Sequence, residues 1–162
     1  MTGESPVSAA TVHRLLLERG ATVAVAESLT GGLLGGALTS TPGSSSTFRG
    51  GLIVYATDLK ETLAGVPGPL LEAEGPVSAS VAAALAAGAR DRIGATYGVG
   101  VTGVAGPDPQ NDQPVGTVYV AVAGPVEGMV RSLRCDGDRE QVRAQSVAAA
   151  LSILAEVVTG HG

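Results

Sequence analysis

Ser28 and the glycines that follow it have residue types and a spacing that suit nucleophilic catalysis. Ser28 ends a short apolar segment and precedes Leu-Thr-Gly-Gly, which is typical of a turn between a strand and a helix. Backbone N–H groups at such a turn can bind an anion or a developing oxyanion, and Gly31 and Gly32 allow a ligand to approach closely. The alternative is that Ser28 only caps a helix and the glycines only make a tight turn.

A serine hydroxyl needs a base, and Lys60 is the candidate because it is the only lysine beside nine arginines. A buried lysine can lose its proton, whereas arginine stays charged. We expect His13 to face solvent, and His161 lies in the C-terminal tail, so neither suits the role. Tyr55 could relay a proton between Lys60 and Ser28 or hold the lysine in place. The alternatives are a lysine on a solvated helix face and an amphipathic tyrosine at a sheet rim.

Four further side chains are weaker candidates. Acidic neighbours of Cys135 oppose thiolate formation, so we interpret this cysteine as structural. Arg139 and Arg143 are one helical turn apart and could grip a phosphate, although such pairs more often lie on a solvated face. Arg49, before the second predicted strand, is a similar case.

The composition of the chain excludes several classes of protein. The length of 162 residues suits one domain, and with one Phe, three Tyr and no Trp the core must be aliphatic. The single cysteine and two histidines argue against disulfides and metal sites, and a net charge of −5 argues against nucleic-acid binding. We find no continuous apolar run of ~18 residues and no signal peptide. We therefore expect a cytoplasmic protein without metal, cofactor, nucleic-acid partner or membrane association.

The elements that position these side chains alternate between strand and helix. We expect strands over 21–26, 51–56, 96–102, 115–123 and 129–134, and helices over 8–19, 33–39, 58–65, 78–92 and 138–158, with an irregular segment over 66–75. This order predicts one α/β domain over 1–162 with a core over 8–158. Its architecture is a three-layer α/β/α sandwich with a mixed, mostly parallel sheet of about five strands, and the last two strands form a hairpin.

Ligands in such folds bind at the carboxyl ends of strands, which here brings together segments 27–32, 55–60 and 102–107. The sequence GVGVTG over 98–103 matches a dinucleotide-binding pattern. Its glycines lie inside a strand, however, and prolines follow where that motif needs a helix. We therefore exclude a dinucleotide site of this type.

Several motifs stand in a fixed order along the chain, namely AESLTGG over 26–32, a Pro-Gly-Ser loop over 42–46, GGLIVY over 50–55, GPVSASVA over 75–82, TGVAGP over 102–107, PVGTVYVAV over 114–122 and GDREQVR over 137–143. Together with Lys60 they resemble the CinA C-terminal domain family, the nicotinamide mononucleotide deamidases. The similarity extends from about residue 8 to residue 158.

This resemblance implies an amidase that hydrolyses nicotinamide mononucleotide to nicotinic acid mononucleotide and ammonia. It implies that Ser28 attacks the amide carbon, with Lys60 as base and Tyr55 as relay or positioning group. We expect backbone N–H groups over 30–32 to hold the oxyanion. Substrate contacts are expected from the strand-end loops and the last helix, at Glu27, Thr30, Gly31, Gly32, Thr102, Gly103, Gly106 and Arg143. The family further suggests a homo-oligomer and a stand-alone form of the domain.

The chain departs from the family at two places. Leu29 replaces a common cysteine, which we expect to alter packing more than chemistry. The segment 108–112 is DPQND where the family is glycine-rich, and its negative charge opposes phosphate binding. Two alternatives therefore stay open: an amidase of the same chemistry acting on another small amide, and a catalytically silent partner-binding module.

Overall fold

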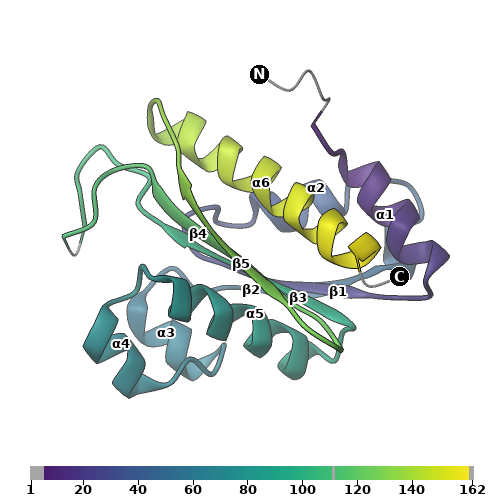
Figure 1. Ribbon diagram of the computed structural model, residues 1–162, viewed down its shortest axis with the longest axis horizontal. Coiled ribbons are helices and arrows are strands. Elements are labelled where there is room, and N and C mark those ends of the chain that lie inside the picture. Colours follow the sequence, from purple (N-terminus) through teal and green to yellow (C-terminus); the bar gives the residue numbers. More distant parts are fainter. Residues whose placement is uncertain (1–5, 111, 161–162) are drawn as a thin grey trace.

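A single five-stranded sheet forms the centre of the computed structural model, which describes residues 6–110 and 112–160 (Figure 1). Its strand order is β2-β1-β3-β4-β5, and the bounds are β1 (Val23–Glu27), β2 (Phe48–Ile53), β3 (Tyr97–Gly103), β4 (Thr117–Ala123) and β5 (Met129–Arg134). β1 pairs in parallel with β2 and β3, whereas β4 is antiparallel to both β3 and β5. The predicted mixed sheet and the hairpin are confirmed, and β4 alone among these strands runs against the others.

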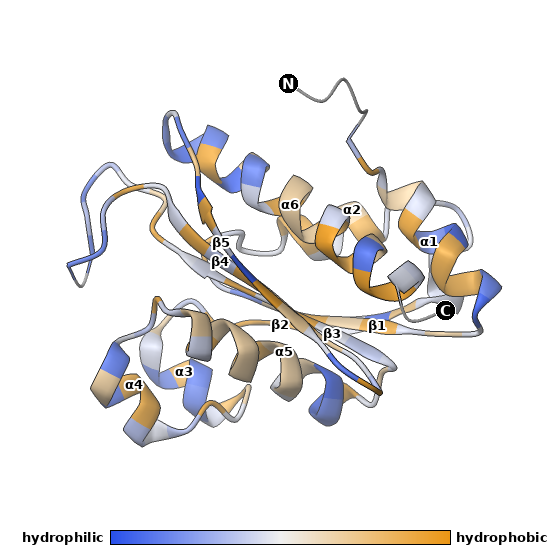
Figure 2. Ribbon diagram, viewed as in Figure 1, coloured by the Kyte–Doolittle hydropathy of each residue, from blue (hydrophilic) through white to orange (hydrophobic). Residues whose placement is uncertain are grey.

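Helices cover both faces of the sheet, as the three-layer prediction requires (Figure 1). α1 (Ala9–Glu18), α2 (Leu33–Leu38) and α6 (Arg139–Gly160) lie on one face, and α3 (Thr57–Thr62), α4 (Gly68–Glu74) and α5 (Ala79–Ile93) lie on the other. A short 3₁₀ helix, η1 (Ser44–Ser46), precedes β2. Apolar residues concentrate in the strands and on the helix sides that face them, which gives the aliphatic core that the composition predicted (Figure 2).

Close packing of α5 on β3 explains the glycines of the GVGVTG sequence. A Cβ atom at Gly98 would meet the carbonyl oxygen of Ala86, and one at Gly100 would meet that of Ala82. Both glycines lie inside β3, as the sequence predicted. They therefore serve the approach of helix to sheet and not the binding of a dinucleotide.

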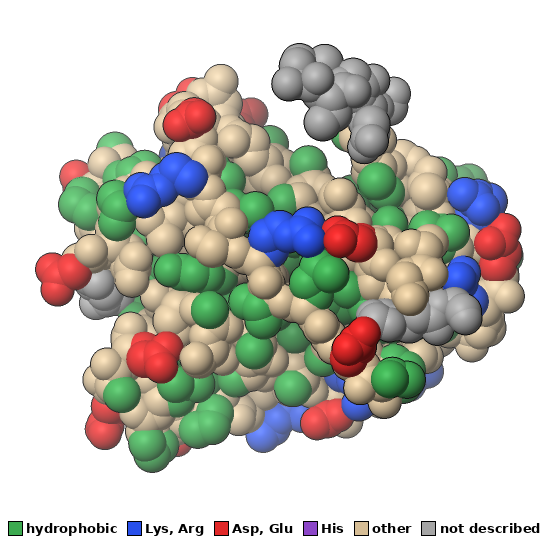
Figure 3. Space-filling view, viewed as in Figure 1, with side chains coloured by type: hydrophobic (Ala, Val, Ile, Leu, Met, Phe, Trp, Pro, Cys, Tyr) green, Lys and Arg blue, Asp and Glu red, His purple; other side chains and the backbone are tan. Residues whose placement is uncertain are grey.

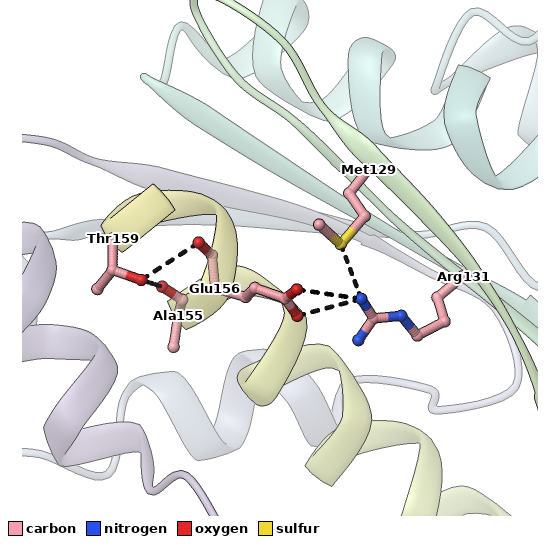
Figure 4. Close-up of polar contacts among 5 residues, drawn as sticks. All are labelled: Met129, Arg131, Ala155, Glu156 and Thr159. Atoms are coloured by element: carbon pink, nitrogen blue, oxygen red, sulfur yellow. Dashed lines mark hydrogen bonds and ion pairs between the residues drawn. The ribbon is translucent and has the colours of Figure 1, made fainter. Parts of the chain in front are cut away.

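α6 is long and apolar enough, by length and composition, to cross a membrane, which the search for a continuous apolar run did not reveal. Half of that stretch is buried inside the protein, where its apolar residues join the core between the sheet and the helices α1, α2 and α6. Arg131 of β5 also holds Glu156 of α6, with its guanidinium 3.1 Å from the nearer carboxylate oxygen (Figure 4). The apolar character of α6 is therefore that of a core helix.

The helix boundaries correct two predictions and confirm a third. The segment predicted to be irregular contains α4, because Pro69 stands in the first turn, where a helix tolerates proline. α3 begins after Ala56, so Asp58 lies in its first turn and does not cap it. Ser78 caps α5 as predicted, with its Oγ accepting from the backbone N–H of Val81 at 3.1 Å.

The start of α6 is fixed by a reciprocal pair of hydrogen bonds. The N–H of Gln141 donates to the Asp138 carboxylate at 2.9 Å, and the N–H of Asp138 donates to the Gln141 side chain at 2.8 Å. This is the predicted capping box. It sets the position of the first turn of α6, which carries Arg139 and Arg143 toward the carboxyl ends of the parallel strands.

Candidate active site

A cleft lies where β1, β2 and β3 end, on the edge of the sheet that the sequence selected. The space in it, including its open mouth, is about 520 Å³. Its lining comes from the ends of these strands, α3, the segment before α5, the loop after β3 and the start of α6, namely Ser28, Leu29, Tyr55, Thr57, Lys60, Pro76, Val77, Thr102, Gly103, Val104, Ala105, Gly106, Asp108, Gln110 and Arg139.

Ser28 and Lys60 are in direct contact in this cleft. Ser28 directly follows β1, and Lys60 reaches it from α3 with its Nζ 3.0 Å from the serine Oγ. The same Nζ donates to the backbone carbonyls of Val54 at 2.8 Å and Tyr55 at 3.2 Å. Only 2% of Lys60 is exposed, so its amine is shielded from solvent and bonds to the serine hydroxyl and the two carbonyls.

Burial lowers the pKa of Lys60 from 10.5 to about 8. Among the described residues, no carboxylate forms an ion pair with this lysine, so no opposite charge offsets the loss of hydration. In the neutral amine, two N–H bonds serve the Val54 and Tyr55 carbonyls and the lone pair faces the Ser28 hydroxyl. The geometry therefore suits transfer of the serine proton to Lys60.

The side chain of Tyr55 does not lie between Ser28 and Lys60, whose direct contact makes a relay there unnecessary. Tyr55 is 60% exposed, and its hydroxyl accepts from Nη2 of Arg139 at 3.0 Å. Nη1 of Arg139 donates to the carbonyl of Gly106 at 2.6 Å. Arg139 therefore joins two walls of the cleft. Tyr55 holds the lysine through its backbone carbonyl and the arginine through its phenol.

The turn after Ser28 leaves two backbone donors without an acceptor. Within the described chain, the N–H of Gly31 donates to the Ser28 carbonyl and the N–H of Gly32 to the Glu27 carboxylate, whereas those of Leu29 and Thr30 have no acceptor. Gly31 and Gly32 have φ angles of +54° and +105°, which explains why this turn needs glycine. In the predicted donor segment 30–32, Gly31 and Gly32 are therefore already engaged and Thr30 is fully buried outside the cleft lining, whereas the free N–H of Leu29 belongs to a residue that lines the cleft.

Glu27 was predicted to contact substrate, and the structure corrects this. Its buried carboxylate accepts backbone N–H groups from Gly32 at 3.2 Å, Leu34 at 2.9 Å and Gly35 at 2.9 Å. These donors belong to the start of α2, on the opposite face of the sheet from α3. Glu27 is therefore the anion that the N-terminus of α2 binds, and this end of the helix has no capacity left for a ligand.

The remaining predicted contacts fall into two groups. Thr102, Gly103 and Gly106 line the cleft, although the Thr102 hydroxyl is engaged with the Pro76 carbonyl at 2.7 Å. The cleft lining does not include Thr30, Gly31, Gly32 or Arg143. Thr57, Pro76, Val77 and Gln110 also line the cleft; they lie in segments singled out from the sequence, but none of the four was predicted to have a role of its own. The position of Pro76 and Val77 just before the Ser78 cap was the available signal for two of them.

Other candidates lie elsewhere in the fold. The side chain of Arg49 donates to the carbonyl of Ile93, away from the cleft, and His13 is half-buried, with Nδ1 2.7 Å from the Thr47 hydroxyl instead of facing solvent. Burial raises the pKa of the Cys135 thiol, which favours its unreactive form. His161 lies outside the described residues.

The fold and cleft define an α/β sandwich with a serine–lysine pair at the carboxyl ends of its parallel strands. The model of the CinA C-terminal domain matches residues 6–158, and the chain belongs to this family. It is 53% identical over 146 residues to a CinA-like protein of Frankia casuarinae, covering 90% of this chain and 34% of that protein. The chain spans about a third of the length of the curated relatives that it matches.

Solved structures of related proteins share the whole fold. A competence/damage-inducible protein from Agrobacterium tumefaciens is 34% identical, with a TM-score of 0.88 over 93% of each chain. A CinA superfamily protein from Klebsiella pneumoniae is 29% identical, with a TM-score of 0.89 over 92% of this chain and 94% of that one.

Proposed function

We propose that the protein is an amidase that hydrolyses nicotinamide mononucleotide to nicotinic acid mononucleotide and ammonia. The observation that supports the reaction class most strongly is the 3.0 Å contact between the Ser28 hydroxyl and the amine of Lys60, which is buried and lacks an ion-pair partner among the described residues. The family resemblance supplies the substrate. The expected cytoplasmic location and homo-oligomeric state stay predictions.

In the first half of the reaction, neutral Lys60 takes the Ser28 proton as the serine oxygen bonds to the amide carbon. The tetrahedral oxyanion accepts from the N–H group of Leu29, the residue of the turn that lines the cleft and has a backbone donor without an acceptor in the described chain. When the C–N bond breaks, the Lys60 ammonium gives its proton to the leaving nitrogen. The products of this half are ammonia and an ester of Ser28.

In the second half, water hydrolyses the ester. Lys60, neutral again, accepts a proton from the water as its oxygen attacks the acyl carbon. The Ser28 oxygen leaves and takes the proton back from Lys60. The carboxylic acid product then loses its proton to the released ammonia or to solvent and leaves as the nicotinic acid carboxylate, and Ser28 and neutral Lys60 return to their starting state.

The mouth of the cleft suits an anionic nucleotide. Arg139 bonds there to two neutral oxygens, and no described carboxylate forms an ion pair with it, so its charge is available to a phosphate. Asp108 and Gln110 line the same cleft and have acceptors suited to ribose hydroxyls. Their position makes the acidic segment compatible with a nucleotide that presents its phosphate to Arg139.

A catalytically silent module explains Lys60 less well. A buried lysine without a counter-ion destabilises the folded state at neutral pH, and a module that needs no base would be more stable with an apolar residue there. The charged side chains on the face in Figure 3 are scattered among uncharged ones and form no basic patch, so this face does not favour nucleic-acid binding.

The substrate is tested with the purified chain and a panel of small amides. Nicotinamide mononucleotide, nicotinamide riboside, nicotinamide and an unrelated primary amide are each incubated at equal concentration, and ammonia and the acid product are measured. We expect the highest kcat/KM for the mononucleotide. A higher value for an amide without phosphate would support the same chemistry on another substrate, and no ammonia from any would refute the amidase.

A further inference from the structure

Asp108 is the only acidic residue among those that line the cleft. Lys60 and Arg139 are basic, and the other lining residues carry no formal charge at neutral pH. Asp108 is exposed and lies on the loop after β3, which Arg139 holds through the Gly106 carbonyl. Within the described chain, its carboxylate takes part in no hydrogen bond or ion pair. Its negative charge is therefore available to a ligand in the cleft.

The proposed substrate carries charges of opposite sign on its ring and on its phosphate. The ring nitrogen of nicotinamide mononucleotide is bonded to the ribose and is therefore a pyridinium with a fixed positive charge. The cleft has the complementary pair, with Arg139 for the phosphate and Asp108 for the ring. These two side chains form no ion pair with each other, so neither charge is neutralised before a ligand binds.

The connectivity of the substrate brings its positive charge close to Asp108. The amide carbon must reach the hydroxyl of Ser28, which is buried, so the ribose lies toward the exposed residues of the mouth. Asp108 and Gln110 are exposed there and have acceptors suited to ribose hydroxyls. Because the ribose is bonded directly to the ring nitrogen, a carboxylate that accepts from the ribose is also beside the pyridinium charge.

The other charges of the cleft oppose the entry of a cationic ring. Arg139 is always positive, and Lys60 is positive whenever it holds a proton. Without Asp108 the lining would therefore carry positive charge only, which repels a pyridinium. Asp108 offsets this repulsion. The acidity that opposes a phosphate thus favours the ring to which the ribose and its phosphate are attached.

We propose that Asp108 is a specificity-determining residue that selects amides on a positively charged ring. The cleft then accepts the pyridinium form of a nicotinamide nucleotide in preference to the dihydropyridine form, whose ring is neutral. The inference rests on the proposed function and narrows its class of substrate. Hydrolysis of the amide leaves the ring charge unchanged, so the attraction is the same in the substrate and in the transition state. Asp108 should therefore act on KM and not on kcat.

The test compares oxidised and reduced nicotinamide mononucleotide, which share the amide, the ribose and the phosphate but differ in ring charge. Ammonia release gives kcat and KM for each with the wild type, Asp108→Asn and Asp108→Glu. The matched control is Asp112→Asn, which removes an exposed carboxylate of the same loop outside the cleft lining, at a φ of 62° that asparagine tolerates. The amides differ in intrinsic reactivity, but this difference cancels when the ratio of their kcat/KM values is compared between proteins.

One charge contact at a hydrated site is expected to change affinity by about 3- to 10-fold. The preference for the oxidised nucleotide should fall by that factor in Asp108→Asn, through KM, and stay near the wild-type value in Asp108→Glu and Asp112→Asn. Added salt should reduce the difference between the wild type and Asp108→Asn, because it screens the contact.

The outcomes separate this inference from the proposed function. An unchanged preference in Asp108→Asn, an equal fall in Asp112→Asn, or a change in kcat alone would overturn the role of Asp108 and leave the amidase in place. No ammonia from either nucleotide with the folded wild type would refute the proposed function and, with it, this inference.

Discussion

The protonation of Lys60 is the property on which the chemistry depends, and a pH titration probes it directly. Burial without a counter-ion sets its pKa at about 8 instead of 10.5, a difference that corresponds to about 3 kcal/mol against the charged form. With that pKa, about a tenth of the molecules carry the neutral amine at pH 7 and about nine-tenths at pH 9. We therefore expect kcat/KM to rise about tenfold between these values, if Lys60 is the base in the free enzyme.

The sequence offers an unusually clean assay, because Lys60 is the only lysine of the chain. Protein labelled with [¹³Cε]lysine gives one lysine Cε signal, whose chemical shift follows the protonation of the amine. The predicted midpoint is about 8, where the rise in kcat/KM should also be centred. The folded state must be checked by circular dichroism at each pH.

The same shift predicts how stability depends on pH. Between the two pKa values the unfolded chain holds a proton that the folded chain has released, so folded-state stability rises with pH across about 8 to 10.5. Lys60→Met lacks this contribution. The difference in unfolding free energy between wild type and Lys60→Met should therefore change by about 3 kcal/mol between pH 7 and pH 11, in favour of the wild type as pH rises.

Either of two results would refute this reasoning. If the labelled Cε titrates near 10.5 in the folded protein, Lys60 is charged at neutral pH and cannot serve as the base. A midpoint near 8 together with a kcat/KM that does not change from pH 7 to pH 9 would also contradict the role of Lys60, although not its burial.

Three further predictions concern neighbouring positions. Glu27→Gln should lower the unfolding free energy in urea by about 1–3 kcal/mol, because an amide cannot accept at both ends from the three N–H groups at the start of α2; an unchanged midpoint would contradict this. Gly31→Ala should destabilise by about 1 kcal/mol or more because of its φ of +54°, whereas Gly36→Ala, in open space within α2, should stabilise or be neutral; equal thermal shifts would count against the turn geometry. Arg139→Met should raise KM for the mononucleotide at least about tenfold with a smaller effect on kcat, and an unchanged KM would exclude it as the phosphate contact.

The sequence predicted the fold and the site best where a single physical rule applied to a segment and no other rule pointed to a different structure. Alternating strands and helices predicted the sandwich, and the short link before β5 predicted the antiparallel hairpin. Lys60 was found by its rarity and Ser28 by its place after a buried strand, and the structure brings the two into contact. Rarity and position of this kind can be read without any knowledge of tertiary contacts.

The errors have equally specific causes. Glu27 adjoins Ser28, but successive residues of a strand point to opposite faces, which sends its carboxylate to α2 while Ser28 faces Lys60 of α3. The alternation itself could have revealed this. Arg139 and Arg143 share one side of α6, and only the docking of that helix decides which of them reaches the cleft. The segment 66–75, which contains two prolines, was predicted to be irregular, although Pro69 fits the first turn of α4.

The most direct test of the central claim, that Ser28 and Lys60 together hydrolyse an amide, is turnover of nicotinamide mononucleotide by four proteins in parallel. These are the wild type, Ser28→Ala, Lys60→Met and, as the matched control, Ser146→Ala, which alters a buried serine of α6 that does not line the cleft. Wild type and Ser146→Ala should release equal amounts of ammonia and nicotinic acid mononucleotide, and the other two at least about 1,000-fold less while remaining folded. Turnover that persists in Ser28→Ala would contradict the account.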